Sequence, residues 1–151
     1  MTRNKSAGFS LIEIMIVISV LGLIAAITIP NLRDARKNAN ETAAIAALKA
    51  IFEGQTMLRD RDLDGDGVQN YTDLPTLVAR LQLDPQFLST RSGYIFEVTR
   101  YDAFSFYCYC RPAQPGLTAD RFFGIDESGQ IYQYPSLADA QSETNPLPIG
   151  G

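Results

Sequence analysis

Acidic and amide side chains recur at short, regular intervals between residues 60 and 73. With Asp62 as the first ligand, the spacing matches D-x-[DN]-x-[DN]-G, the pattern of a calcium-binding loop. A hard cation prefers six to eight oxygen ligands at about 2.3–2.6 Å, and a turning loop brings alternate side chains inward. Gly67 permits the sharp turn that this requires. The sequence therefore predicts a structural calcium ion held by Asp62, Asp64, Asp66, Val68, Asn70 and Asp73.

The last ligands of this loop differ in kind from the first. Val68 would offer its backbone carbonyl, Asn70 would bind directly or through water, and Asp73 replaces the usual closing glutamate. The alternative is a solvated acidic turn, because Asp and Gly are ordinary loop residues. The run also resembles the calcium loops of dockerins and thrombospondin type 3 repeats. Outside the cytoplasm, such a loop belongs to a class with dissociation constants of about 10⁻⁴–10⁻³ M.

A single carboxylate, Glu13, lies inside the apolar run from residue 9 to residue 29. About 20 apolar residues span a hydrocarbon core as a helix, so the run is long enough to cross a membrane. A carboxylate there costs about 2.5–3.5 kcal/mol on insertion scales, which makes it a functional candidate. Cleavage between Gly8 and Phe9 would create an α-amino group at Phe9. That amine would pair with Glu13 of its own chain or of a neighbouring chain.

Two simpler interpretations of the same run fit less well. A secretory signal peptide has a shorter apolar stretch of about 7–15 residues and then a small-residue cleavage site. Here Ala25 and Ala26 lie inside the run and more β-branched residues follow. A plain single-span anchor leaves Glu13 unexplained.

The letters GFSLIE, from Gly8 to Glu13, resemble the processing signal of type IV pilins and of type II secretion pseudopilins. The resemblance implies that a prepilin peptidase cuts after Gly8 and methylates the new terminus at Phe9. It also implies that Glu13 contacts the N-terminus of an adjacent subunit during assembly. Gly22 and Pro30 match the family too, whose helix loosens between these positions on entering a filament. Glycine is a poor helix former and proline removes a backbone donor, which agrees with such loosening.

The fold expected is α+β and pilin-like. A long N-terminal helix, transmembrane in its first half, packs by its second half on an antiparallel sheet of about four strands. The chain divides accordingly into a cleaved leader (1–8), a transmembrane and assembly helix (9–30), the amphipathic half of the same helix (31–59), the calcium loop (60–73) and a globular head (74–151).

The elements of the expected head follow from periodicity and turn residues. In the amphipathic half, apolar residues recur at steps of three and four, at Leu32, Ala35, Ala39, Thr42, Ile45, Leu48 and Phe52. The opposite, polar side carries Arg36, Lys37, Asn40, Glu41 and Glu53. A short helix is expected over 76–83, capped by Asp73 or Thr72. Alternation predicts strands over 94–100, 104–110, 121–126 and 130–134, with a hairpin-like turn at 127–129. The tail after Tyr134, rich in Pro, Gly, Ser and Asn, is expected to be loop or partly disordered.

The two cysteines, Cys108 and Cys110, are separated by one residue. Disulfides persist in the oxidising compartment expected for the head, but two cysteines at this spacing on a strand lie near the upper limit for a bridge. A strained Cys108–Cys110 disulfide, two free thiols and an intermolecular bond all stay open. The long C-terminal disulfide loop common in pilins is not available to this chain.

Composition argues against catalysis and nucleic-acid binding. The 151 residues include no histidine, and the net charge is −4. A serine or cysteine nucleophile would need another base, and neither a Gly-rich phosphate loop nor a G-x-S-x-G motif is present. An acidic chain also lacks the electrostatic footprint of a nucleic-acid-binding protein. The chain is expected not to be an enzyme and not to bind nucleic acid.

The resemblance implies a structural subunit of a type IV pilus. Its expected partners are identical or related pilin subunits, the prepilin peptidase, the inner-membrane assembly machinery and, before assembly, membrane lipid. It would cross the bacterial inner membrane once and then join an extracellular pilus. One alternative is a pseudopilin of a type II secretion system, in a periplasmic filament. Another is a monomeric, membrane-tethered calcium-binding module.

Overall fold

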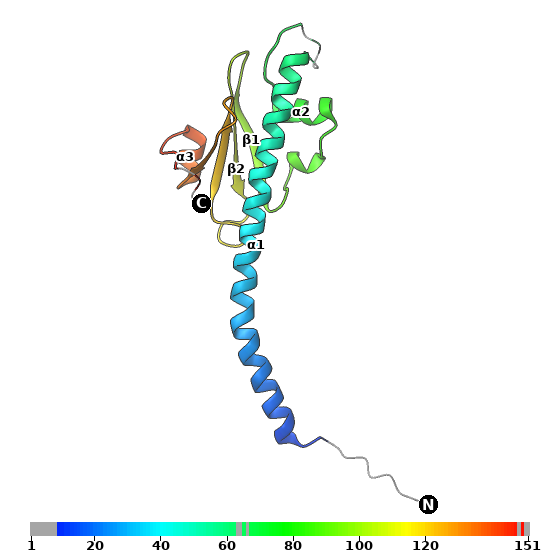
Figure 1. The fold of residues 1–151 in the computed structure, drawn as a ribbon, viewed down its shortest axis with the longest axis vertical. Coiled ribbons are helices and arrows are strands. Elements are labelled where there is room, and N and C mark those ends of the chain that lie inside the picture. Colours follow the sequence, from blue (N-terminus) through cyan, green and yellow to red (C-terminus); the bar gives the residue numbers. More distant parts are fainter. Residues whose placement is uncertain (1–8, 63–64, 66, 148, 150–151) are drawn as a thin grey trace, which may run out of the picture. The chain divides into compact units, whose positions relative to one another are not determined.

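The computed structural model describes residues 9–62, 65, 67–147 and 149. Helix α1 (Leu11–Arg61) is the longest element, and the chain divides within it into two compact units, Met1–Ala35 and Arg36–Gly151. The described part of the first unit is residues 11–35 of α1 with the two residues before them. The second unit, the head, contains the rest of α1 and seven further elements (Figure 1). They are α2 (Leu74–Leu81), η1 (Pro85–Leu88), β1 (Tyr94–Tyr101), β2 (Phe106–Pro112), β3 (Phe122–Asp126), β4 (Ile131–Tyr134) and α3 (Leu137–Ser142).

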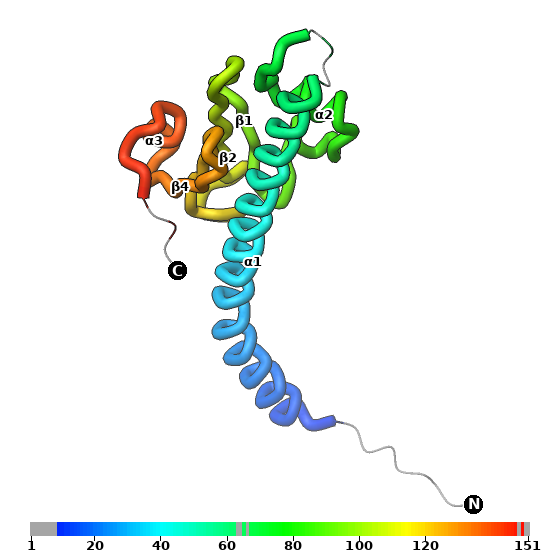
Figure 2. The backbone as a smooth tube through the Cα atoms, turned by 45° about the horizontal axis from the view of Figure 1, so that its top comes forward, coloured from blue at the N-terminus to red at the C-terminus, as the bar shows by residue number. Residues whose placement is uncertain are grey.

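The head is built in layers around one antiparallel sheet. The four strands pair in chain order, β1-β2-β3-β4. Figures 1 and 2 show the second half of α1 against one face of the sheet, α3 against the other, and α2 on the side of α1 away from the sheet. The expected α+β fold, a long helix packed on a four-stranded antiparallel sheet, is confirmed.

The buried face of α1 differs from the predicted one. Leu48 belongs to both, but Ala39 and Thr42 are exposed, and Ile45 and Phe52 are half-buried. The residues buried instead are Glu41, Ala44, Ala47, Leu48, Ile51, Gly54, Gln55 and Leu58. This face is rotated by about one residue, or roughly 100°. Small side chains at three of these positions permit close packing, which the apolar pattern alone does not reveal.

An ion pair between a buried glutamate and a partly exposed arginine accompanies this rotation. The side chain of Glu41 is 5% exposed and forms a salt bridge with Arg121, which is 38% exposed. One Glu41 carboxylate oxygen accepts from the backbone N–H of Asp120 at 3.2 Å, and the other accepts from Arg121 Nε at 2.6 Å. Nearby, Lys37 pairs with Asp120 at 2.9 Å and Asn40 donates to the carbonyl of Thr118. Polar residues predicted to face solvent therefore attach α1 to the segment between β2 and β3.

The four strands match the predicted segments with small shifts. The second begins at Phe106 instead of residue 104, because Asp102 accepts hydrogen bonds from the N–H groups of Phe104 and Ser105 and makes a turn there. Strand β2 is buried on both faces. Phe106, Cys108 and Cys110 belong to the main core with α1, while Tyr107 lies in a second cluster with Tyr109, Tyr134 and Ala140.

The tail after Tyr134 was predicted to be loop, and this prediction is wrong for residues 137–142, which form α3. The Ser136 hydroxyl accepts from the N–H of Asp139 as an N-cap, and Glu143 ends the helix at a φ of 56°. The Tyr107 hydroxyl donates to the Ala140 carbonyl at 2.7 Å, which holds α3 against the sheet. A helix of six residues is too short to show a periodic pattern.

Helix α2 begins and ends about two residues before the predicted 76–83. Asp73 is its N-cap, as expected, and Pro75 lies in its first turn, where a missing N–H costs nothing. Gln82 ends the helix in the left-handed region, at a φ of 52°.

Candidate functional site

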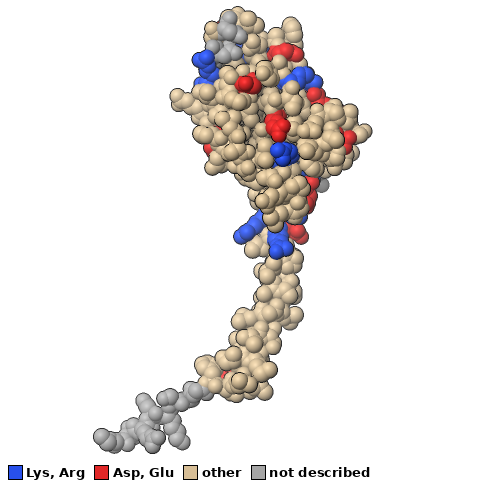
Figure 3. Space-filling view, turned by 180° about the vertical axis from the view of Figure 1, so that it is seen from behind, with Lys and Arg blue, Asp and Glu red and all other residues tan. Residues whose placement is uncertain are grey.

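The apolar stretch of α1 in the first unit is exposed along its whole length. Phe9 is 78% and Leu11 is 80% exposed, and every large apolar residue up to Ile29 is exposed. Figure 3 shows this stretch almost free of charged side chains. Among the described residues it is the one helix long and apolar enough to span a membrane, and none of its most apolar window is buried. Such a surface is stable only against lipid or other apolar helices.

The polar side chains of this stretch divide into satisfied hydroxyls and one carboxylate. Ser19 Oγ donates to the Met15 carbonyl at 2.7 Å, and Thr28 Oγ1 donates to the Ile24 carbonyl at 2.8 Å. Both hydroxyls are thus compatible with hydrocarbon. The carboxylate of Glu13 is exposed and, within the described ranges, forms no salt bridge. Glu13 is therefore the one charged side chain in this apolar stretch of the described helix.

The other predicted processing and assembly residues lie on or before the same helix. Gly8 is outside the described residues, and Phe9 precedes the first turn, where the Ser10 carbonyl accepts from the N–H of Glu13 at 3.1 Å. Helix α1 continues through Gly22 and Pro30. A Cβ at Gly22 would meet no atom within 4 Å. The Ala26 carbonyl has no helical donor, because Pro30 lacks an N–H. The roles of these residues in processing and assembly stay predictions.

The acidic loop is described in part. Asp64 and Asp66 lie outside the described residues, so the full ligand set stays a prediction. Asp62 adopts a φ of 47°, and its Oδ2 accepts from the N–H of Gly67 at 3.1 Å. Its Oδ1 is buried and has no hydrogen-bond partner in the described part of the chain. The first carboxylate of the predicted loop is thus folded inward across the turn that Gly67 makes, with one oxygen left for a further ligand.

The later ligands of the predicted loop differ in exposure and in hydrogen bonding. Val68 is exposed and Asn70 is half-buried. Asp73 Oδ1 accepts from the N–H of Thr76 at 2.9 Å as the cap of α2, which leaves Oδ2 for a cation. Among the described residues, no three His, Cys, Asp or Glu side chains come close enough to hold a metal ion.

A buried glutamine that no sequence pattern predicted fixes the end of the loop. Gln55 is fully buried; its Nε2 donates to the Thr72 carbonyl at 2.6 Å, and its Oε1 accepts from the Thr72 N–H at 3.0 Å. Beside it, Arg59 donates to the Tyr71 hydroxyl at 2.7 Å. The chain between Tyr71 and Asp73 is therefore attached to α1. The available signal was a glutamine one turn from Ile51 and Leu58 on the buried face.

Both cysteines are free thiols in the structure, and both are fully buried on the core side of β2. Burial raises the pKa of both thiols, so they stay protonated at neutral pH. A protonated thiol without access to solvent is a poor partner for an intermolecular disulfide. Of the three alternatives left open, the structure contains the free thiols.

Comparisons with known proteins agree with this geometry. Residues 3–29 match the family model described as the prokaryotic N-terminal methylation motif. The chain is 48% identical over 143 residues to the type IV wide pilus major component PilA4 of Thermus thermophilus, covering 95% of this chain and 99% of that protein. It is 41% identical over 59 residues to the type II secretion system core protein G of Pseudomonas aeruginosa, covering 39% of this chain and 42% of that protein.

A third relative is the type IV major pilin protein PilA of Myxococcus xanthus, 42% identical over 53 residues, which cover 35% of this chain and 23% of that protein. The matches to this pilin and to the secretion protein therefore include less than half of either relative. The match to the Thermus protein extends over nearly the whole of both chains, through the exposed helix and the head alike. On that similarity, with the methylation motif and the fold in agreement, the chain belongs to the type IV pilin family.

Proposed function

We propose that this protein is a structural subunit of a type IV pilus that polymerises through residues 9–29, which include the first part of α1. The observation that carries the proposal is the apolar surface of this stretch, exposed from Phe9 to Ile29 in the single chain. Packing identical helices side by side buries that surface and repeats without limit, as a filament requires. Similarity to a pilus major component over 95% of the chain supports the same function. The role is structural and not catalytic.

The chemistry proposed for assembly begins with the N-terminus. A prepilin peptidase would cut after Gly8 and methylate the new amine of Phe9. Before assembly, the apolar helix would hold the chain in the inner membrane. In the filament, the positive amine of one subunit would pair with Glu13 of its neighbour. This pairing neutralises a carboxylate that would otherwise be costly in an apolar bundle.

The alternative, a pseudopilin of a type II secretion system, has weaker support. The similarity to the secretion protein G of Pseudomonas aeruginosa covers 39% of this chain, compared with 95% for the pilus component. The two functions predict different locations: a pilus is recovered from the cell surface, and a pseudopilus is not.

Intact-mass spectrometry tests the proposal. The protein is isolated from membranes and from filaments sheared off the cell surface. A mass that begins at Phe9 with one added methyl group, in both fractions, is the expected result. The processed mass in membranes alone would favour the pseudopilin. A chain that still begins at Met1 in every fraction, or one that begins beyond Ala26, would contradict the filament function.

We further propose that residues 62–73 bind a calcium ion that stabilises the connection between α1 and α2. The buried, unpaired Oδ1 of Asp62 and the inward fold of its side chain across Gly67 support this. The two Gln55–Thr72 hydrogen bonds would fix the far end of the loop, so the ion would join two segments that the core already positions. The proposed ligands are Asp62, Asp64, Asp66, Val68, Asn70 and Asp73.

A further inference from the structure

A mainly apolar hollow of about 310 Å³ lies on the head, between α1 and the end of α2. Gly54 lets the two helices approach closely there, because a Cβ at this position would lie 3.1 Å from the side chain of Leu81. Met57 is 41% exposed at the hollow. The lining residues of this α1–α2 hollow are Ala50, Glu53, Gly54, Met57, Leu81 and Leu83.

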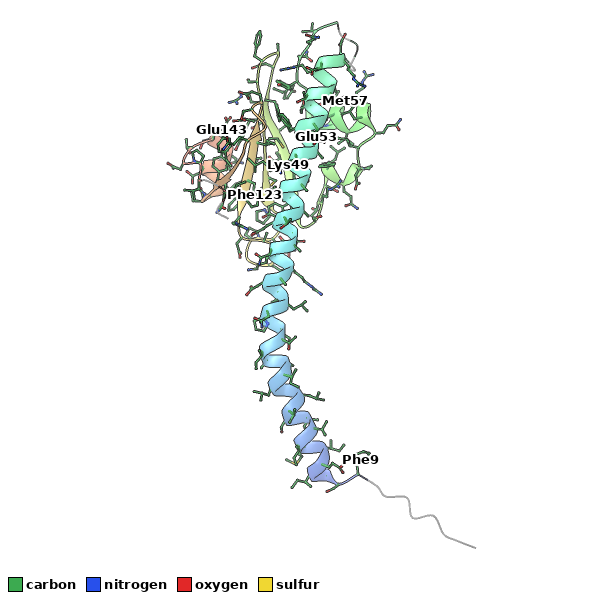
Figure 4. The ribbon with its side chains drawn as sticks, viewed as in Figure 1. Phe9, Lys49, Glu53, Met57, Phe123 and Glu143 are labelled. Carbon is green, nitrogen blue, oxygen red and sulfur yellow. The ribbon has the colours of Figure 1, made fainter. Side chains whose placement is uncertain are left out.

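The hollow has one charged residue in its lining, and that residue is an acid. Glu53 is exposed and lies one turn before Met57 on α1 (Figure 4). It forms no salt bridge with any described residue, and Lys49, one turn earlier on the same helix, does not pair with it. The surface that complements this hollow therefore has apolar side chains and a single positive charge.

One exposed apolar residue of this chain has such a charge beside it. Among the exposed large apolar residues in the described ranges, only Leu32 has a basic side chain within three positions that forms no salt bridge there, namely Arg33. Basic residues also lie within three positions of Met57, Leu88 and Tyr101, but each is paired with an acid. These pairs are Arg59 with Asp60, Arg91 with Asp84, and Arg100 with Glu143.

The surroundings of Leu32 form a continuous face of α1. Ile29, Leu32 and Arg33 are spaced at three and four residues, so their side chains are neighbours on the helix. Ile29 is 54% and Leu32 is 52% exposed, and Arg33 is exposed as well. This Leu32 face directly follows the apolar stretch that would be buried in a filament. Burial of that stretch would bring Arg33 against other copies, where a guanidinium without an acidic partner would be costly.

We propose that the Leu32 face of one subunit docks in the α1–α2 hollow of another, with Leu32 against Met57 and Arg33 paired with Glu53. The two surfaces are different, so each copy offers one of them to each of two neighbours. A heterologous contact of this kind repeats head to tail and generates an open filament, whereas an isologous contact stops at a dimer. The docking rests on the filament function proposed above.

Cysteine cross-linking in filaments tests the apolar part of the contact. The double variant Leu32→Cys with Met57→Cys is expressed in cells that assemble the filament, and sheared filaments are oxidised and run on a non-reducing gel. A ladder of dimers, trimers and larger species is expected. Matched controls are the single variant Leu32→Cys and the pair Leu32→Cys with Phe104→Cys. Phe104 is 86% exposed but lies between β1 and β2, outside the lining of the hollow.

A charge exchange tests the polar part. Arg33→Glu alone and Glu53→Arg alone should each reduce sheared filaments at least fivefold, because like charges would then face each other. The double variant Arg33→Glu with Glu53→Arg should restore the yield to within twofold of the unaltered chain. Asp34→Arg is the matched control. Asp34 is exposed and lies about 100° around the helix from Arg33, so its reversal should leave the yield unchanged.

The outcomes separate this contact from the proposed function. Filaments that yield no ladder, or an equal ladder from the Phe104 control, would overturn the docking and leave the pilus function intact. Failure of the exchanged pair to restore the yield would overturn the pairing of Arg33 with Glu53. A loss of Arg33→Glu from membranes, measured by immunoblot, would assign Arg33 to lipid headgroups instead. Absence of surface filaments from the unaltered chain would contradict the function itself.

Discussion

The two stretches of helix α1 share a secondary structure but differ in what surrounds them. Residues up to Ala35 are exposed on every side and apolar on nearly every side, whereas the later stretch buries one face against the sheet and α2. Helical hydrogen bonds pair the backbone groups in the interior of both, except at the Ala26 carbonyl opposite Pro30. In water, however, tertiary packing stabilises the second stretch, and only lipid or other helices can stabilise the first. One continuous helix thus joins a folded head to an exposed apolar surface that its own chain does not cover.

Two glutamates on this helix make the difference concrete. Glu41 is buried and is neutralised within its own chain by Arg121. Glu13 has no salt-bridge partner among the described residues, although it lies in the more apolar stretch. The cost of removing a carboxylate from water is therefore compensated for Glu41 within the head. For Glu13 it would be compensated only on assembly.

Replacing Glu13 is expected to have the largest effect. Glu13→Gln removes the charge that would pair with a neighbour's N-terminal amine, so sheared filaments should be reduced at least tenfold. Membrane insertion should be unchanged or improved, because an uncharged side chain enters hydrocarbon more readily. Filament yield and membrane content are measured by immunoblot. Ser19→Ala is the matched control, since that hydroxyl bonds only to its own helix. Normal filament yield from Glu13→Gln would remove the assembly role of Glu13.

Replacing the second glutamate should have the opposite pattern. Glu41→Gln leaves the half-buried Arg121 without its carboxylate and should lower the free energy of unfolding of the head by about 2–3 kcal/mol, below the range for fully buried pairs. Denaturant unfolding of the chain in detergent, followed by tyrosine fluorescence, measures the change. Lys37→Gln breaks a neighbouring pair whose acid is 57% exposed, and should cost less than about 1 kcal/mol. Equal losses of unfolding free energy in the two variants would show that burial does not make the Glu41 pair more stabilising than the Lys37 pair.

Two glycines sharpen the comparison further. A Cβ at Gly124 would lie 2.3 Å from the Tyr107 hydroxyl, whereas a Cβ at Gly22 would touch nothing. Gly124→Ala should therefore displace Tyr107, weaken its hydrogen bond to Ala140 and destabilise the head by about 1–3 kcal/mol. Gly22→Ala should leave unfolding of the head unchanged. The same denaturant titration compares them, and faster hydrogen exchange across α3 should accompany Gly124→Ala alone. Retained protection of α3 in Gly124→Ala would mean that Tyr107 does not hold it.

The local signals in this sequence predicted most of the elements. Asp73 and Pro75 placed the start of α2 within two residues, alternation located all four strands, and the apolar run located the exposed helix. These features depend on residues close together in the sequence. A strand repeats every two residues and a helix every 3.6, so the order of apolar and polar residues indicates them.

The features that were missed depend on residues far apart in the chain. Glu41 was assigned to the polar side because Arg121, its partner, lies eighty residues later. Gln55 contacts Thr72 across the acidic loop, and no periodic pattern indicates that contact. Helix α3, six residues long, covers Tyr107, and no periodic pattern predicted that helix. For the candidate site, residue type and spacing identified Glu13 and Asp62, but not that Asp62 would fold inward across the turn at Gly67.

The smallest expected effect concerns calcium, and it should be confined to the head. At 1 mM calcium, a loop with a dissociation constant of about 10⁻⁴–10⁻³ M stabilises the folded chain by roughly 0.4–1.4 kcal/mol. Asp62→Asn should abolish that gain, because Asp62 supplies the buried Oδ1. Asp60→Asn is the matched control, since Asp60 pairs with Arg59 and is not one of the proposed ligands, which begin at Asp62. The denaturant titration is repeated with calcium, with magnesium and with chelator. Equal stability of the unaltered chain in all three, or an undiminished calcium gain in Asp62→Asn, would leave residues 62–73 as a solvated turn.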